Sequence, residues 1–362
     1  MISLDNFSAI KKHDHSGMAS VIAAFPDQCR EAVKIGLHAK IPASYKTKYR
    51  NIVCAGMGGS AIGADLARSY IADESLTPFF VNRNYTLPAF VSKDTLVIAS
   101  SYSGNTEETI AAFRDAIGKG ARIIVITTGG KLRDLALKRS IPVIQIPSGI
   151  QPRAAIGYSF FTLILTLSRL GIIGNKTAEI AEAIKCMADL GKASLYPDVF
   201  GTKNIAKNIA KSIYLKIPVI YSNADHMDAV CMRWRGQLAE NAKTIASSGL
   251  FPEMVHNEIV GWEHPAKALK DLVVIMLRDR DDNIRVAKKM DIVRREIAGL
   301  GVKVVEVKSR GKGLLARMFS LVYIGDYVSL YLAALNGCDP TPVDRIVRLK
   351  REMERFGKAG TR

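Results

Sequence analysis

The chain has 362 residues and 48% of them are apolar, so it is long enough for two domains and can fill two hydrophobic cores. Its formal net charge of +17 suits nucleic acid, an acidic membrane surface or an anionic metabolite as a partner. The densest basic cluster, 345–355, contains acidic residues as well, and no recognisable nucleic-acid-binding motif accompanies it. These observations argue against nucleic acid and favour a phosphorylated metabolite.

The sequence shows no sign of export or of membrane insertion. Its longest apolar candidate, 156–170, is interrupted by hydroxyl side chains and by Arg169, and the first residues do not resemble a signal peptide. Five cysteines, an odd number without a C-x-x-C pair, argue against a disulfide framework or a zinc site. We therefore expect a soluble cytoplasmic protein without a membrane partner, a metal or another cofactor.

Residues 1–48 are expected to form a helical extension, with a break at Phe25-Pro26. Within it, His13-Asp14-His15 has residue types that bind metals. Three adjacent residues without further ligands are more often a solvated turn, so we assign no metal to them.

From residue 49 the pattern alternates between strands and helices. We expect strands at 51–55, 78–82, 94–100, 122–127 and 141–146, and helices at 61–70, 106–119, 132–138 and from Arg153 onward. Short β-branched strands separated by helices indicate an α/β fold with a doubly wound parallel sheet. This first domain is expected to cover 49–172.

A glycine-rich segment, Gly56–Gly63, follows the first expected strand. Its spacing is neither the G-x-G-x-x-G of dinucleotide-binding folds nor a P-loop, so no nucleotide is predicted. Backbone amides beside Gly59 and Ser60 can bind an anionic sugar at the helix start. The alternative is that the glycines serve only a tight turn between strand and helix.

The segment 94–110 is expected to form a strand, an anion-binding loop and a helix. Gly104 permits the turn, and Ser101, Ser103 and Thr106 place hydroxyls beside the new helix N-terminus, which is where a phosphate binds well. Asn105 or Thr106 is expected to cap the helix. The alternative is a polar loop that provides only this cap.

The second half repeats the order of elements after a connection at 173–202. We expect helices at 203–215, 227–242, 284–298 and 314–336, and strands at 217–222, 272–277 and 303–307. A second domain is therefore predicted at 203–362, related to the first at the level of fold, although it lacks a serine-rich loop.

Several side chains in this sequence suit acid-base chemistry. Glu240 lies near the end of an expected helix and off its apolar stripe, where the negative end of the helix dipole makes a carboxylate a better proton acceptor. The alternative is an exposed glutamate paired weakly with Lys243. His256 follows in an irregular segment and can shuttle protons near neutral pH. Arg153 and Lys350 are cations that can bind an oxyanion, or they are ordinary surface charges.

Seven motifs in this order resemble those of a known family: Gly56-Met-Gly-Gly-Ser60, Ser101-Tyr-Ser-Gly-Asn-Thr106, Thr127-Thr-Gly-Gly130, Pro152-Arg-Ala-Ala155, Glu240-Asn-Ala-Lys243, His256-Asn257, and Asp339-Pro340 with Lys350. Over about residues 50 to 350 the chain is similar to the bifunctional phosphoglucose/phosphomannose isomerases, a branch of the sugar isomerase (SIS) superfamily. The ordered combination is more specific than any single motif.

The resemblance implies two SIS subdomains in each chain and a homodimer in which the neighbouring chain completes the active site. The implied reaction interconverts glucose 6-phosphate, and also mannose 6-phosphate, with fructose 6-phosphate through a cis-enediol and without a metal. Glu240 matches the proton acceptor, and His256, from the partner subunit, would open the sugar ring together with Lys350. The implied substrate-binding residues are Gly59, Ser60, Ser101, Ser103, Thr106 and Arg153, with Arg153 stabilising the developing oxyanion.

One position departs from the family pattern. Seven residues before Lys350, where the bifunctional enzymes have a threonine, this chain has Val343, which makes the mannose reaction less secure than the glucose reaction. Two other functions remain open. One is a non-catalytic SIS protein that senses a sugar phosphate, and the other is a SIS isomerase of a different sugar phosphate.

Overall fold

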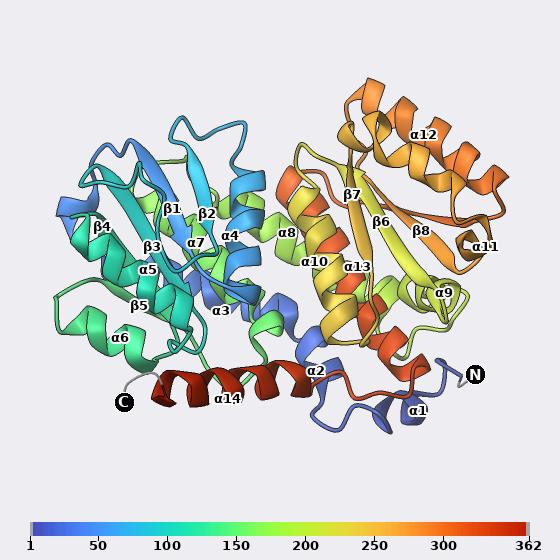
Figure 1. Ribbon diagram of the computed structural model, residues 1–362, viewed down its shortest axis with the longest axis horizontal. Helices are drawn as coiled ribbons and strands as arrows, with labels where there is room; N and C mark the ends of the chain where they lie inside the picture. The colour runs from blue at the N-terminus through green and yellow to red at the C-terminus, as the bar shows by residue number, and fades with distance from the viewer. Residues whose placement is uncertain (1–2, 360–362) are drawn as a thin grey trace.

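Two parallel β-sheets face each other across a layer of helices, and further helices cover their outer faces (Figure 1). The computed structural model describes residues 3–359. The first sheet contains β1 (Asn51–Ala55), β2 (Phe79–Asn82), β3 (Thr95–Ser101), β4 (Arg122–Thr127) and β5 (Val143–Gln145). Helices α4 (Gly58–Tyr70), α5 (Glu107–Gly118) and α6 (Gly130–Leu137) connect its strands.

The strand order of the first sheet, β2-β1-β3-β4-β5, determines where a ligand can bind. All neighbouring strands are parallel, and the order reverses direction between β1 and β3. In doubly wound sheets the crevice at such a reversal, beyond the carboxyl ends of the strands, is the usual ligand site. The loops after β1 and β3 are the glycine-rich and serine-rich segments, so both predicted anion-binding loops lie at this point.

The second sheet has the order β7-β6-β8-β9, which repeats the first sheet without its fifth strand. Its strands are β6 (Ile217–Asn223), β7 (Ser247–Phe251), β8 (Leu272–Arg278) and β9 (Lys303–Lys308), and its helices are α9 (Ile205–Ile213), α10 (Asp228–Glu240), α11 (Ala266–Leu269) and α12 (Ile284–Gly299). The predicted α/β class with two doubly wound parallel sheets of similar topology is confirmed. The edge strand β7 was not predicted, because Ser-Ser-Gly-Leu-Phe contains no β-branched residue.

The side chains of both sheets alternate between two buried faces, as their period of two requires. In β1, Val53 faces an outer core under α5 and α6, whereas Ile52 and Cys54 face inward. The second sheet has an outer core of its own under α12. The inward faces of both sheets belong to one continuous core, so the two halves are packed together as a single body.

Two apolar helices fill this central core, α7 (Ile156–Arg169) from the first half and α13 (Leu314–Leu335) from the second. They meet through aromatic rings, with the centroids of Phe160 and Phe319 4.7 Å apart. By length and composition α13 is able to cross a membrane, but its apolar window is 100% buried inside the protein. The longest apolar helix is therefore α13 rather than the segment 156–170 expected from the sequence.

The N-terminal segment is built into this body. It forms α1 (Phe7–Lys11), α2 (Met18–Ala23) and α3 (Phe25–His38), and α3 packs along α7. Pro26 lies in the first turn of α3, so the helix break comes one residue earlier than expected. Asp14 accepts the backbone N–H groups of Met18 and Ala19 at 2.6 and 2.8 Å, which gives it a capping role at the start of α2.

The segment 173–202 contains α8 (Thr177–Leu190), which packs against α13 and α3. Beyond it, the Lys207 ammonium has no solvent exposure and donates to Asp5 at 3.0 Å and to the carbonyls of Pro197 and Val199 at 2.8 Å. These bonds join the first residues of the chain to the start of the second half. The domain boundaries expected at 48, 172 and 202 remain a prediction.

Candidate active site

The serine-rich loop after β3 is held in a compact form by its own hydroxyls. Ser101 Oγ and Thr106 Oγ1 are 2.9 Å apart, and Ser60 Oγ accepts the N–H of Tyr102 at 3.2 Å. Thr106 occupies the N-cap position of α5, but no side chain within residues 3–359 caps this helix. The expected capping by Asn105 or Thr106 is therefore wrong. The loop therefore has no capping bond to explain its hydroxyls, and phosphate binding there stays a prediction.

A second loop supports the serine-rich loop from behind. Gly104 has a φ of +66°, and a Cβ built on it would lie 1.7 Å from the carbonyl oxygen of Gly129. Thr128 Oγ1 donates to the carbonyl of Tyr102 at 2.7 Å. The contact allows no side chain at position 104. The Thr127-Thr-Gly-Gly130 motif thus fixes the shape of the loop that carries the hydroxyls.

The glycine-rich loop lies against the turn that carries Arg153. This turn, η2 (Pro152–Ala154), precedes α7, and a Cβ on Gly59 would lie 2.4 Å from the carbonyl oxygen of Pro152. Gln28 of α3 supports the other side of the turn: it donates to the carbonyl of Ala154 and accepts the N–H of Gly157, each at 2.9 Å. Any side chain at position 59 would collide with this turn, so the position of Arg153 depends on glycine there.

The Arg153 side chain is 3% exposed and lies between the two halves of the chain. Its Nε donates to Asn241 Oδ1 at 2.6 Å, and its Nη2 donates to the carbonyls of Pro340 and Thr341 at 2.6 and 2.9 Å. Its Nη1 faces a carboxylate, Glu240 Oε2, at 3.4 Å. Burial lowers the pKa of Arg153 below its ordinary value, and the Glu240 carboxylate opposes that effect. An arginine nevertheless stays charged, so Glu240 faces a fixed cation.

The structure explains the spacing of the Glu240-Asn-Ala-Lys243 motif. Glu240 ends α10 and pairs with Arg153, while Asn241 accepts the Arg153 Nε–H. Lys243 has a left-handed φ of 55°, and its Nζ donates to the carbonyls of Glu240 and Pro342 at 2.6 and 2.7 Å. The expected alternative, a weak Glu240–Lys243 ion pair, is wrong, because Lys243 holds backbone oxygens instead.

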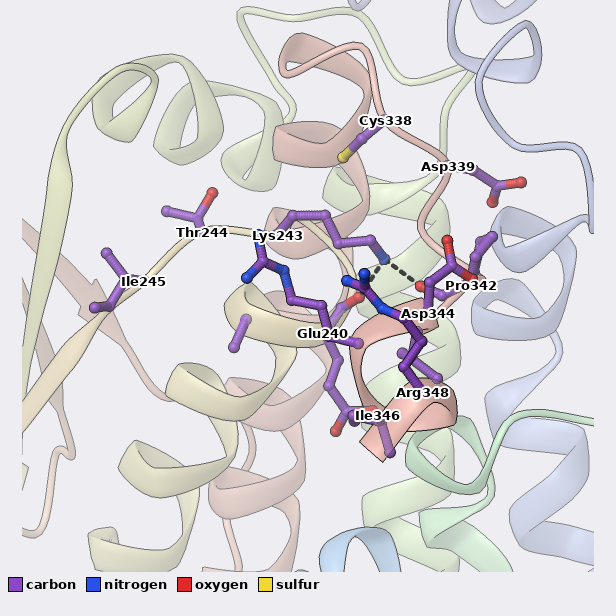
Figure 2. Close-up of a pocket in the computed structure, with 13 residues that line it drawn as sticks. Glu240, Lys243, Thr244, Ile245, Cys338, Asp339, Pro342, Asp344, Ile346 and Arg348 are labelled. Carbon is purple, nitrogen blue, oxygen red and sulfur yellow. Dashed lines mark hydrogen bonds between the residues drawn. The ribbon is translucent and has the colours of Figure 1, made fainter. Parts of the chain in front are cut away.

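A cavity of about 760 Å³ opens beside Glu240 (Figure 2). Its wall is formed by the end of α10, by residues 338–343, and by the first turns of the last helix, α14 (Asp344–Ala359). Figure 2 shows Lys243 extending toward Pro342 at this cavity. Val343, the position that departs from the family pattern, also lines it. Glu240 and Val343 therefore line the same cavity.

Both halves of the chain match SIS families, and complete relatives match across their junction. Residues 47–161 match the SIS domain, and residues 202–353 match the bacterial phospho-glucose isomerase C-terminal SIS domain. The bifunctional phosphoglucose/phosphomannose isomerase of Caldicellulosiruptor bescii is 46% identical over 91% of this chain and 96% of its own. The enzyme of the same description from Aquifex aeolicus is 38% identical over 85% of this chain and 92% of its own.

This chain belongs to the bifunctional phosphoglucose/phosphomannose isomerase family. Solved structures agree on the fold. A hypothetical protein from Thermus thermophilus superposes with a TM-score of 0.74 at 16% identity, covering 98% of this chain and 94% of its own. A glucose-6-phosphate isomerase like protein from the same organism gives 0.62 at 19% identity, covering 95% and 99%.

The single chain does not bring all of the family's expected site residues together. His256 lies on η4 (Glu253–His256), is exposed, and does not line the cavity beside Glu240. Lys350 is exposed on α14 and does not line it either. The predicted substrate-binding residues do not line this cavity either, namely Gly59, Ser60, Ser101, Ser103, Thr106 and Arg153. Ser60 nevertheless bonds the serine-rich loop, and Gly59 and Glu240 contact the Arg153 turn or side chain.

Sequence reasoning missed the buried residues that surround Arg153. Asn241 and Lys243 lie within a recognised motif, but their targets are Arg153 and backbone carbonyls, which the sequence does not reveal. Asp326 is different, because its position in the sequence indicates a buried partner and could have been recognised. It is a carboxylate in the interior of the apolar helix α13, where a charge must find a partner. Its partner is Arg233, at 2.8 Å.

Replacing Gly59 by alanine tests the link between the glycine-rich loop and Arg153. The added methyl group would displace the Pro152–Arg153 turn, so we expect kcat to fall about 10-fold or more. The matched control is Gly236→Ala in α10, where a Cβ has no described atom within 4 Å. This control should raise stability by about 0.5–1 kcal/mol without loss of kcat. A Gly59→Ala enzyme with unchanged kcat would show that the turn does not depend on this glycine.

Proposed function

We propose that this protein is an aldose-ketose isomerase that interconverts glucose 6-phosphate and mannose 6-phosphate with fructose 6-phosphate. The observation that carries the proposal is the Glu240–Arg153 pair, at the junction of the two halves and beside a cavity. Proton transfer between adjacent carbons needs a carboxylate held in a fixed position, and this pair supplies one. Membership of the isomerase family gives the substrate class.

In the proposed reaction Glu240 removes the proton from C2 of the open-chain aldose. The electrons of the C2–H bond form the C1=C2 double bond of a cis-enediolate with its charge on O1. A proton passes from O2 to O1, and the Glu240 carboxylic acid then returns its proton to C1 to give the ketose. Arg153 orients Glu240, and among the described contacts its Nη1 is the one guanidinium nitrogen without a carbonyl or amide acceptor. That nitrogen is the donor available to stabilise negative charge on the enediolate oxygen.

The phosphate is proposed to bind at the serine-rich loop. Ser101, Ser103 and Thr106 offer hydroxyls next to the N-terminus of α5, whose first amides receive no side-chain cap from the described residues. Gly59 and Ser60 bring the start of α4 to the same crevice between β1 and β3. Two helix N-termini and neutral hydroxyls can hold a phosphate dianion without a metal. The basic surface of the protein attracts the same anionic substrate.

The active site is proposed to be shared between two copies of the chain in a cytoplasmic homodimer. His256 is exposed on η4 and does not reach the cavity of its own chain, which supports its delivery to Glu240 of the partner. The last helix, α14, also exposes large apolar side chains, including Leu349 at 61% and Phe356 at 73%. Apolar surface of this kind is typical of an interface. Together with Lys350, His256 would open the pyranose ring.

The direct test is an assay of the purified protein with fructose 6-phosphate that follows glucose 6-phosphate and mannose 6-phosphate separately. Glu240→Gln should lower kcat for both products by about 10³-fold, because the base is removed while the shape is kept. Val343→Thr, which alters the cavity wall beside Glu240, should raise the mannose reaction relative to the glucose reaction. Wild-type protein without turnover of either sugar would sink the proposal, and so would full activity in Glu240→Gln.

Mixing two inactive variants tests the shared site. If His256 serves the partner's Glu240, a mixture of Glu240→Gln and His256→Ala chains forms hybrids that contain one intact site. Random pairing then restores about one quarter of wild-type activity. Glu240→Gln mixed with the double variant Glu240→Gln/His256→Ala is the control and should stay inactive. No recovery in the first mixture, with hybrids confirmed by mass, would place His256 in its own chain's site or outside any site.

A further inference from the structure

A buried ion pair between α10 and α13 lies directly behind the Arg153 turn. Arg233 and Asp326 are each 3% exposed, and Arg233 Nη2 donates to both carboxylate oxygens of Asp326 at 2.8 and 2.9 Å. Gln237, one turn further along α10, donates to the same carboxylate at 2.8 Å. This cluster does not line the cavity, and none of its side chains takes part in the proposed reaction.

The pair is bonded to the main chain of Arg153. Both Nη1 and Nη2 of Arg233 donate to the carbonyl oxygen of Arg153 at 3.2 Å. In a regular helix the N–H of Gly157 would take that carbonyl, but Gly157 donates to Gln28 Oε1 instead. The carbonyl of Arg153 is therefore left for Arg233.

The same two helices also hold the Arg153 side chain. Asn241, which accepts the Arg153 Nε–H, donates its own amide to Ser329 Oγ at 2.9 Å. Ser329 Oγ in turn donates to the carbonyl of Asp326 at 2.7 Å. Arg233, Gln237 and Asn241 recur every four residues and so lie on one face of α10, toward α13. Both the backbone carbonyl and the side chain of Arg153 are therefore hydrogen-bonded to residues on this face of α10.

Stability alone does not account for the pair. Removing two charges from water costs about as much as their attraction returns, and apolar residues of similar volume are often as stable or more stable. Arg233 also has a buried Nε without an acceptor among the described residues, a further unfavourable contribution. What the charged pair provides, and an apolar pair does not, is a set of donors directed at one carbonyl oxygen, that of Arg153.

We propose that Arg233 and Asp326 are positioning residues: they fix the turn that carries Arg153 and thereby hold Glu240 in its reactive orientation. The inference rests on the proposed isomerase function. It assigns neither residue a contact with the substrate. Because neither side chain bonds the serine-rich loop, where the phosphate is proposed to bind, loss of the pair should lower kcat and leave KM for fructose 6-phosphate nearly unchanged.

The test measures kcat, KM and thermal stability for Arg233→Met and for the nearly isosteric Asp326→Asn. We expect kcat to fall about 10- to 100-fold, because a misplacement of about 1 Å near a reacting group costs this much, while KM stays within about twofold. Arg317→Met is the matched control. It breaks a buried pair with Asp279, at 2.8 and 3.0 Å, nine residues or about 13 Å along α13 from Asp326. This control should lose stability but keep kcat.

A double-mutant cycle separates positioning from a structural role. With Arg153→Lys in place, adding Arg233→Met should lower kcat less than about twofold further, while its effect on thermal stability persists. Equal losses of kcat in both backgrounds, or a loss no larger than in Arg317→Met, would overturn the inference. A rise in KM with unchanged kcat in Arg233→Met and Asp326→Asn would overturn it as well. Wild-type protein without isomerase activity would instead refute the proposed function.

Discussion

The site depends on one buried cation, the Arg153 guanidinium, which comes from the first half of the chain and donates its hydrogen bonds to the second half. The Arg153 guanidinium is 3% exposed, so its donors need acceptors within the protein. The acceptors are the Asn241 side chain and the carbonyls of Pro340 and Thr341, all from the second half. The remaining guanidinium nitrogen, Nη1, faces Glu240. The arginine comes from the first half, beside the predicted phosphate loop. Closing the two halves around this charge places the proposed catalytic carboxylate next to the half that carries this loop.

The two halves share a topology but differ in what their loops carry. In the first sheet, the strands beside the reversal of order end in glycines and hydroxyls, which suit an anion. In the second sheet, β8 is followed by Asp279, Asp281 and Asp282, whose carboxylates pair with arginine side chains. Arg317 neutralises Asp279 instead of binding a ligand. In the proposed site, the second half contributes Glu240 from the end of a helix, and the phosphate is assigned to the first half.

Local patterns in the sequence were sufficient to predict most strands of the two sheets and the positions of the glycine-rich and serine-rich loops, because short β-branched strands and glycine turns depend on nearby residues. The edge strand β7 was missed since its residues lack that preference, and it is a strand only because β6 pairs with it. The hydrogen-bond partners of Arg153 could not be predicted from the sequence, for another reason. Its partners at 340 and 341 are backbone carbonyls, which every residue possesses, and they lie 187 and 188 positions away in sequence.

The central claim is that Glu240 moves a proton between C2 and C1 through an enediol, and the hydrogen of the product reports this directly. When fructose 6-phosphate is converted in D₂O, the proton held by Glu240 exchanges with solvent before it is returned. Proton NMR should therefore show deuterium at C2 of glucose 6-phosphate and at C1 of the remaining fructose 6-phosphate. Sustained turnover with protium fully retained at both carbons would contradict the account, because it would indicate direct hydride transfer between them.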